Sequence, residues 1–307
     1  MKLERIGLIG FGEVGKIFAA GLREKSGVVQ ASAWDLKFTD AALRATEMGI
    51  AQAGGIHTCA SMRELCEHSD LIISAVTASN TLAVAREAAS FMRAGQTFLD
   101  LNSASPGTKQ QAAAAVQAAG ADYVEAGVMT SVPPYGIRVP MLLGGAQAAS
   151  LARVLHDWGM DAKAVSEQLG VASAIKMCRS VMIKGLEALV IESYTTARAY
   201  GVEDHVLPTL QETFPSIDWS EQGAYFFSRV VQHGKRRAEE MRESANTVRE
   251  AGFAPIMTTS IADKQQWVAD CAREGVFAGV GKNARWQDYA DALLAARKDS
   301  GSVKSRA

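Results

Sequence analysis

The sequence predicts an α/β N-terminal domain with a doubly wound, mostly parallel sheet, joined by a long helix to an all-helical C-terminal domain. Two features of the sequence predict this class. Short apolar segments alternate five or six times with helical patterns up to about residue 165, an alternation typical of parallel sheets covered by helices. From there on the pattern is helical throughout. We therefore expect a first domain at residues 1–165 and a second at 166–298.

The strands of the first domain are expected in six short apolar segments, with helical stretches between them. A strand directly followed by a helix, repeated in this way, places successive parallel strands in one sheet. The strand-like segments are RIGLIG, VVQASAW, LIISAV, QTFLDL, ADYVEAGV and VPMLLGG, and the helical stretches include GKIFAAGLRE, SMRELCEH, SNTLAVAREAASFMR and TKQQAAAAVQAA.

The connecting segment predicts one long helix over about residues 169–199. It has no proline and a single internal glycine, and its apolar residues lie on nearly every face. At about 1.5 Å per residue this helix would extend for roughly 45 Å. Such a helix usually connects domains or lies in a subunit interface. Further helices follow, with Gly201 and Gly252 at expected C-caps, and the polar tail 299–307 is expected to be disordered.

Charge and cysteine content exclude several classes of function. Lys and Arg (32) nearly balance Asp and Glu (33), so no overall field favours nucleic acid or an anionic membrane as partner, and a small molecule is expected instead. The four cysteines and the histidines lack metal-ligand spacing, so we expect no metal. The N-terminus lacks the apolar core of a signal peptide, and no uninterrupted apolar run could span a bilayer. A cytoplasmic location is expected.

A glycine motif lies in the stretch GLIGFGEVG, between the first strand-like segment and the first helical pattern. Gly10, Gly12 and Gly15 have the spacing G-x-G-x-x-G, and Asp35 follows at the end of the second strand-like segment. The first glycine permits a tight turn, the second lets the backbone approach a pyrophosphate, and the third lets the helix pack closely on the strand. The helix N-terminus offers amide groups to the anion. The first domain is therefore predicted to be a dinucleotide-binding Rossmann domain.

The acid at the end of the second strand indicates which dinucleotide binds. Asp35 can accept hydrogen bonds from the ribose 2'-hydroxyl of NAD, whereas the 2'-phosphate of NADP would meet a like charge there. Lys37 follows two residues later and could neutralise that phosphate if its side chain pointed inward. NAD is favoured on this electrostatic ground, and NADP stays the alternative.

Four segments, in order along nearly the whole chain, resemble the 3-hydroxyacid dehydrogenase family, which includes 3-hydroxyisobutyrate and 6-phosphogluconate dehydrogenases and related imine reductases. The chain looks like a divergent member. The first segment is the glycine motif, and the second is similar to the D-x-S-T-x-x-P segment beside the nicotinamide. The third resembles the family's substrate loop, and the fourth its lysine-bearing helix. The segments are GLIGFGEVG, DLNSASP, YVEAGVMTSVPPYGIRVPMLLGG and GVASAIKMCRS.

The resemblance implies a Rossmann domain, a connecting helix and a helical domain, commonly assembled as a homodimer. It also implies reversible hydride transfer between a nicotinamide cofactor and a hydroxyl-bearing carbon, most often β to a carboxylate. Residues expected to bind the cofactor lie in the glycine motif, at the second strand-like segment and in the two loops near the nicotinamide. They are Gly10, Phe11, Gly12, Glu13, Val14, Gly15, Asp35, Lys37, Val76, Asn102 and Ser103.

Lys176 matches the family's catalytic lysine. A lysine on an otherwise apolar helix must find a partner, reach solvent, or lose its proton more readily because it is desolvated. In the last case it can take the proton of a substrate hydroxyl during oxidation and return it during reduction. The alternative is a lysine whose ammonium group reaches the surface, as most helix lysines do.

Two positions depart from the family pattern. Ser180 stands where the family usually has an asparagine, one turn after the lysine, and it can still donate one hydrogen bond from the same face. Met129 replaces the loop serine that commonly contacts the substrate carboxylate, and a thioether cannot bind that group. Either the hydroxyls of Thr130 and Ser131 take over, or the substrate is bulkier and less polar there.

A basic segment of the helical domain, HGKRRAEEMRE, falls where the family often carries a Lys-Asp pair near the active site. We expect His233 and Arg236 to bind the acidic end of a carboxylate-bearing substrate or to close over the cofactor, because the guanidinium fork suits a carboxylate. Alternatively this is a solvent face with salt bridges, since Arg236 has Glu240 four residues on.

These observations predict an NAD(P)-dependent oxidoreductase of a substituted 3-hydroxy acid, with Lys176 as general acid and base and Ser180 beside it. An imine reductase on the same scaffold is one alternative, which Lys176 disfavours because the family's imine reductases usually carry another residue there. A protein that binds or senses NAD(H) without turnover is the other, and the departures at Met129 and Ser180 keep it open.

Overall fold

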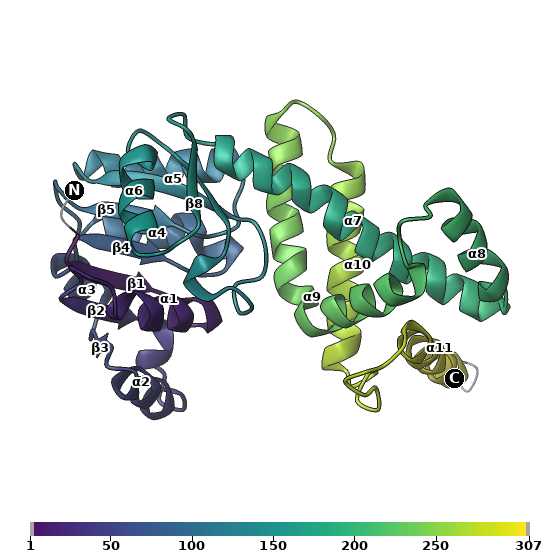
Figure 1. The fold of residues 1–307 in the computed structure, drawn as a ribbon. Helices are drawn as coiled ribbons and strands as arrows, with labels where there is room; N and C mark the ends of the chain where they lie inside the picture. The colour runs from purple at the N-terminus through teal and green to yellow at the C-terminus, as the bar shows by residue number, and fades with distance from the viewer. Residues whose placement is uncertain (1–2, 305–307) are drawn as a thin grey trace. The chain divides into compact units, whose positions relative to one another are not determined.

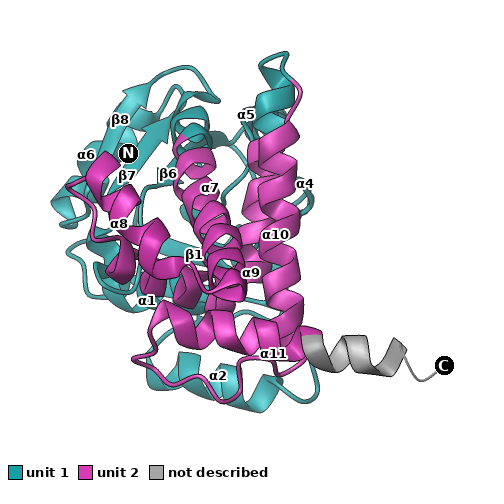
Figure 2. Cartoon of the chain, turned by 90° about the vertical axis from the view of Figure 1, so that its right-hand side faces the viewer, with its two compact units in different colours: residues 1–178, 246–253 teal, residues 179–245, 254–307 magenta. Residues whose placement is uncertain are grey.

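The computed structural model describes residues 3–304, and side chains as far as residue 297 (Figure 1). Two compact units divide the chain (Figure 2). The first consists of the residues up to Cys178 together with Asn246–Phe253, and the second of Arg179–Ala245 and the residues from Ala254 on. The first unit is an α/β structure and the second is helical, which confirms the fold class predicted from the sequence.

An eight-stranded sheet forms the centre of the first unit, in the order β3-β2-β1-β4-β5-β6-β7-β8. All neighbouring strands pair parallel except β6 and β7. The chain runs outward from β1 to β3 and then returns to β4 on the other side of β1. Such a reversal opens a crevice at the carboxyl ends of the strands, where ligands of doubly wound folds bind. The strands are β1 (Arg5–Ile9), β2 (Gln30–Trp34), β3 (His57–Thr58), β4 (Leu71–Ser74), β5 (Thr97–Asp100), β6 (Asp122–Val128), β7 (Met141–Gly144) and β8 (Ala162–Ser166).

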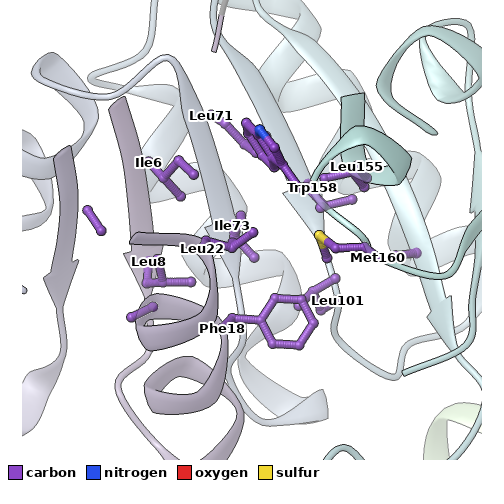
Figure 3. Packing of buried hydrophobic residues seen from close by; sticks show 14 of the residues in the cluster. Ile6, Leu8, Phe18, Leu22, Leu71, Ile73, Leu101, Leu155, Trp158 and Met160 are labelled. Carbon is purple, nitrogen blue, oxygen red and sulfur yellow. The ribbon is translucent and has the colours of Figure 1, made fainter. Parts of the chain in front are cut away.

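Helices cover both faces of this sheet. Leu71 and Ile73 of β4 point into one apolar cluster and Ile72 into the other, because side chains alternate along a strand. Phe18 and Trp158 close the first cluster (Figure 3). Full burial of a side chain such as Phe18 contributes about 1.5–3 kcal/mol to stability. The helices of the unit are α1 (Glu13–Arg23), α2 (Arg44–Ala53), α3 (Met62–Glu67), α4 (Thr81–Ala89), α5 (Pro106–Ala118) and α6 (Ala148–Asp157), with short 3-10 turns at Leu36–Phe38, Ala78–Asn80 and Gly136–Arg138.

The second unit is built around long helices. The expected long helix is α7, which begins within the first unit and ends at Tyr200, just before Gly201, a residue with positive φ. An aromatic cluster that includes Tyr194, Phe227 and Trp286 forms the core. The last helix ends at Lys304 and residues 305–307 lie outside the described part, so the disorder expected for residues 299–307 stays a prediction. The helices are α7 (Val171–Tyr200), α8 (Glu203–Thr213), α9 (Trp219–Glu250), α10 (Ile256–Arg273) and α11 (Trp286–Lys304).

Two strands were not visible in the sequence. β3 has only two residues at the sheet edge, too few to show a period. β8 has no fully buried residue, so it lacks the apolar run that marks an internal strand of a parallel sheet. None of the helices between residues 3 and 304 combines the length and the apolar composition needed to cross a bilayer.

Candidate active site

The glycine turn has the geometry that its spacing predicts. Gly10 has φ +95°, and a Cβ there would lie 2.5 Å from the carbonyl oxygen of Ala75. A Cβ on Gly15 would overlap the Gly10 carbonyl oxygen, so α1 can pack on the turn only with glycine at this position. At Gly12, the N-cap of α1, a Cβ would have no described atom within 4 Å. The turn thus leaves open space at the helix N-terminus, where a phosphate fits.

The remaining residues of the turn differ in exposure. Phe11 is buried and its ring packs against Phe38, 5.7 Å between centroids. Glu13 is exposed and Val14 is half-buried. The turn therefore exposes mainly backbone and one carboxylate, while Phe11 anchors it to the core.

Asp35 holds the glycine turn from the end of β2. Its Oδ2 accepts a hydrogen bond from the Phe11 amide at 2.6 Å, and its Oδ1 accepts one from the Lys37 amide at 2.9 Å. The Lys37 ammonium lies 3.7 Å from Glu47 Oε1, and the Lys16 ammonium 2.7 Å from Glu47 Oε2. The hydrogen bond from Lys16 lowers the pKa of Glu47, and the charge of Lys37 adds to this effect. Glu47 therefore offsets the positive charge beside Asp35.

The loops after β4 and β5 are tied together at the same edge of the sheet. Asn102 Oδ1 accepts from the Val76 amide at 2.7 Å, and Asn102 Nδ2 donates to Ser74 Oγ at 2.9 Å. A Cβ on Gly10 would contact Val76 Cγ1 at 3.0 Å. Ser103, next to Asn102, is half-buried. The glycine turn, Val76 and Asn102 are thus neighbours at the carboxyl ends of β1, β4 and β5.

A buried polar network that the sequence did not reveal lies under the Asn102 loop. Asp100 Oδ1 accepts from the Asn102 amide at 2.9 Å and lies 3.0 Å from Lys109 Nζ, and Asp100 Oδ2 accepts from the Tyr123 hydroxyl at 2.6 Å. Asp100, Lys109 and Tyr123 are at most 2% exposed. Burial, and then the charge of Asp100, raises the pKa of Tyr123 well above its ordinary value. The network fixes the backbone that carries Asn102.

Lys176 is half-buried on the first turns of α7, which pack on β6. A Cβ on Gly127 would lie 3.4 Å from Lys176 Cβ and 2.9 Å from the Ala172 carbonyl oxygen, so only glycine lets the helix approach this closely. Two residues earlier on the strand, the fully buried Glu125 accepts from the amides of Gly170 (2.7 Å) and Ala172 (3.1 Å). Strand β6 therefore both caps α7 and places Lys176.

The predicted substrate loop follows β6. Met129 is half-buried and its amide donates to the Pro140 carbonyl at 2.9 Å. Thr130 is exposed and Ser131 is half-buried. Because β6 is the neighbour of β5, this loop leaves the sheet beside the loop of Asn102. The first unit thus gathers the glycine turn, the Asn102 loop, the Met129 loop and the helix of Lys176 at the carboxyl ends of adjacent strands.

The other predicted residues belong to the second unit. Ser180 is buried and its hydroxyl accepts from Lys184 Nζ at 3.2 Å, while Lys184 Nζ lies 2.8 Å from Glu240 Oε2. Arg236 is exposed, with its Nε 3.9 Å from Glu240 Oε1, and His233 is half-buried on the same helix. The i,i+4 pair that the sequence offered as an alternative for Arg236 is therefore present.

A buried ion pair that the sequence did not reveal joins α7 and α9. Arg237 donates to Glu187 through both Nε, at 2.8 Å, and Nη2, and Gln265 Nε2 approaches the same carboxylate at 3.3 Å. Glu187 and Arg237 are 50 residues apart on α7 and α9, so no local spacing signals the pair. The pair fixes α9 against α7 inside this unit.

An open glycine turn at a helix N-terminus, at the switch point of a doubly wound sheet, defines a dinucleotide-binding domain. Residues 5–160 match the NAD binding domain of 6-phosphogluconate dehydrogenase, and residues 197–268 match a domain of unknown function, DUF1932. The first of these matches covers half of the chain, so the chain belongs to the family defined by the NAD binding domain of 6-phosphogluconate dehydrogenase.

Three solved structures illustrate the relationship. A conserved hypothetical protein from Sinorhizobium meliloti is 35% identical, with a TM-score of 0.75 over 95% of this chain and 96% of that one. The conserved protein MTH1747, of unknown function and described as structurally similar to 3-hydroxyacid dehydrogenases, is 30% identical, with a TM-score of 0.67 over 88% and 98%. The 3-hydroxyisobutyrate dehydrogenase of Mycobacterium tuberculosis shares the fold, at 16% identity and a TM-score of 0.68 over 88% and 95%.

Proposed function

We propose that the protein is an oxidoreductase that interconverts a substituted 3-hydroxy acid and its oxo form with a nicotinamide cofactor. The observation that carries the proposal is the position of Lys176, on a helix that Glu125 caps and Gly127 draws close to β6. Lys176 is thereby held at the carboxyl ends of the strands, where the glycine turn also lies. An ionisable amine in this position is suited to proton transfer.

The positions of Lys176 and Asn102 indicate how each would take part in the reaction. The nicotinamide, when bound, supplies or accepts the hydride. During oxidation Lys176 takes the proton from the substrate hydroxyl, and during reduction it returns a proton to the carbonyl oxygen. Asn102, fixed by Ser74, Val76 and Asp100, borders the space for the nicotinamide.

We further propose that NAD is preferred over NADP. A 2'-phosphate would face the carboxylate of Asp35, and the positive charge of Lys37 is already offset by Glu47. The negative charge of Asp35 next to a 2'-phosphate disfavours NADP. Lys16 and Lys37 are paired with Glu47 and therefore attract that phosphate less strongly.

Glu47→Gln is accordingly expected to shift the cofactor preference toward NADP. Without the carboxylate, Lys16 and Lys37 face solvent uncompensated, and the KM for NADP should fall about two- to fivefold, the range of exposed ion pairs, with the KM for NAD nearly unchanged. Steady-state kinetics with both cofactors measures this. Glu24→Gln, which removes the exposed partner of Arg23, is the matched control. An unchanged NADP constant in Glu47→Gln would show that these lysines do not face the 2'-position.

We propose a carboxylate-bearing substrate with an apolar group. Met129 contributes a thioether to the loop, with the hydroxyls of Thr130 and Ser131 beside it, so the loop suits a bulky side group better than a small polar one. Ser180 is proposed to face the substrate, and Arg236, with His233, to bind its acidic end. Glu240, which pairs with Arg236, would compete with the substrate carboxylate for its guanidinium group. If Arg236→Ala leaves KM and kcat unchanged, this role of Arg236 is excluded.

An assay of nicotinamide absorbance tests the proposed function. The purified protein is given NAD or NADP with 3-hydroxy acids that range from small aliphatic to aryl-substituted, and cyclic imines with the reduced cofactors. Turnover of a bulky 3-hydroxy acid with NAD is the expected result. Turnover of imines alone would favour imine reduction, and tight NADH binding without turnover of any substrate would favour a sensor.

We also propose a homodimer, because α7 presents an apolar face to solvent. Met182, Leu189 and Tyr200 are 66%, 54% and 80% exposed, and spacings of 7 and 11 residues place them on one side of the helix. An exposed apolar face of this kind is typical of an interface with another protein chain. Light scattering on the eluting protein should give twice the mass of the 307-residue chain, and a monomer at micromolar concentration would contradict the proposal.

A further inference from the structure

Three side chains with metal-binding chemistry converge at the edge of the sheet, on β3 and the turn before α3. The imidazole of His57, the thiol of Cys59 and the carboxylate of Glu64 each offer one atom, and these atoms all lie within 4.8 Å of one another. His57 Nε2 is 3.5 Å from Glu64 Oε1. We propose that these three residues form a binding site for Zn²⁺ or a similar divalent transition metal ion.

The identity of the ligands indicates the class of metal. Thiolate, imidazole and carboxylate together suit zinc and its transition-metal neighbours, whereas calcium and magnesium require oxygen ligands. With bonds of about 2.0–2.3 Å, two ligands of a tetrahedral zinc ion lie roughly 3.3–3.7 Å apart. The separation of His57 Nε2 and Glu64 Oε1, 3.5 Å, already falls in this range. Small movements of the other side chains would complete a three-ligand site.

Local structure fixes Glu64 for this role. The Ser61 hydroxyl caps α3 by accepting from the Glu64 amide at 3.1 Å, and Glu64 Oε2 accepts from the Ala60 amide at 2.7 Å. This reciprocal arrangement resembles a capping box. It engages one carboxylate oxygen and leaves the other, Oε1, turned toward His57. The carboxylate is therefore oriented before any ion binds.

Strand pairing fixes the other two ligands. His57 is in register with Ser32 of β2, and the Cys59 amide donates to the Ala33 carbonyl at 2.9 Å. Both ligands are therefore held by backbone pairing with β2.

The burial of each ligand determines how an ion reaches the site and whether the thiol carries its proton. Cys59 is 1% exposed, but the side chain of His57 is 53% exposed, so an ion reaches the sulfur from the solvent side and keeps room for a water as fourth ligand. Burial raises the pKa of the Cys59 thiol to about 12, so the thiol carries its proton without metal. Binding replaces the S–H bond by a sulfur–metal bond and releases that proton to solvent.

The ion would act as a clamp on the sheet edge. β3 has two residues, and it pairs with β2 alone among the described strands. A bridge between His57, Cys59 and Glu64 ties this short strand to the first turn of α3. Since β2 ends next to Asp35, the clamp also supports the strand that carries the cofactor's ribose ligand. The site is independent of Lys176 and of the proposed chemistry.

Cobalt titration tests the proposal directly. The full chain is stripped of metal with a chelator, kept reduced, and titrated with Co²⁺, which reports a bound thiolate by a charge-transfer band in the near ultraviolet. One equivalent should produce this band, and Zn²⁺ should displace it. Zn²⁺ should also raise the unfolding midpoint of the metal-free protein by several degrees, because it binds only the native site.

Matched variants separate the site from chance binding. Cys59→Ser should abolish the band, and His57→Ala should weaken binding at least tenfold. Cys178→Ser and His156→Ala, which alter an exposed thiol and an exposed histidine outside the cluster, should change neither. Glu64→Gln keeps an acceptor for the Ala60 amide and should lower the affinity without loss of the fold.

Two outcomes would overturn the proposal. One is Co²⁺ binding without a thiolate band in the parent protein, and the other is equal Zn²⁺ affinity in the parent and in His57→Ala. His57 is exposed, so its variant folds even if Cys59→Ser does not. The cluster would then be only a helix cap with a neighbouring histidine.

Discussion

Lys176→Ala is expected to lower kcat about 100- to 10,000-fold, the usual contribution of a positioned general acid or base, while the affinity for the cofactor changes little. The backbone of α7 at this point is held by Glu125 and packs on Gly127 through the main chain and Cβ, so the alanine side chain preserves the helix position. Steady-state turnover of the best substrate and fluorescence titration with NADH measure the two quantities.

Lys176→Arg distinguishes proton transfer from simple electrostatic binding. Arginine keeps the positive charge but does not release its proton in a protein, so this variant should be nearly as slow as Lys176→Ala. Lys163→Ala, on the exposed side of β8, is the control and should retain full activity. A Lys176→Arg protein with more than a tenth of the parent kcat would exclude the acid–base role.

Asp100→Ala is expected to cost about 3–5 kcal/mol of unfolding free energy, because it leaves the ammonium of Lys109 buried without its counter-charge. It also removes the acceptors for the Tyr123 hydroxyl and the Asn102 amide. Urea denaturation gives the stability, and the KM for the cofactor should rise because the Asn102 loop loses its support.

A double variant provides the control for this effect. Asp100→Ala combined with Lys109→Met removes both charges, and much of the lost stability should return, since an apolar pair avoids the uncompensated ion. The KM should stay raised, because the Asn102 amide still lacks its acceptor. If the single variant is as stable as the parent, the buried pair does not hold this region together.

The dinucleotide-binding domain was predictable from the sequence because its signals are local. The glycine spacing of Gly10, Gly12 and Gly15 encodes backbone geometry, and the structure shows the positive φ of Gly10 and the close approach at Gly15 that this spacing requires. The long α7 was predictable because its segment has no proline and a single internal glycine, so nothing in it breaks a continuous helix. Its bounds, Val171–Tyr200, differ from the expected ones by one or two residues.

The networks that hold the site were not predictable, because their partners are far apart in the sequence. Lys109 lies in an alanine-rich helix, where it looks like a solvent-facing residue, and only the fold brings it to Asp100 with Tyr123 on the next strand. Glu125 is similar, because its function as cap of α7 depends on a helix 45 residues away.

The strand β3 at the edge of the sheet was not predicted for a different reason. β3 is too short to show an alternation, and its pairing with β2 is what brings His57 and Cys59 alongside Glu64. Their positions in the sequence match no common metal motif. The strand β7 was predicted in VPMLLGG, but its antiparallel pairing with β6 was not, since an apolar strand carries no sign of its direction.

Isotope transfer tests the proposed hydride transfer and the role of Lys176 in one experiment. A substrate from the 3-hydroxy acid panel is prepared with deuterium on the hydroxyl-bearing carbon, and the reduced cofactor formed by the purified protein is analysed by mass spectrometry. One deuterium is expected in each reduced nicotinamide, with formation about 100- to 10,000-fold slower in Lys176→Ala. Reduced cofactor without deuterium, or equal rates in the variant, would contradict the proposed function.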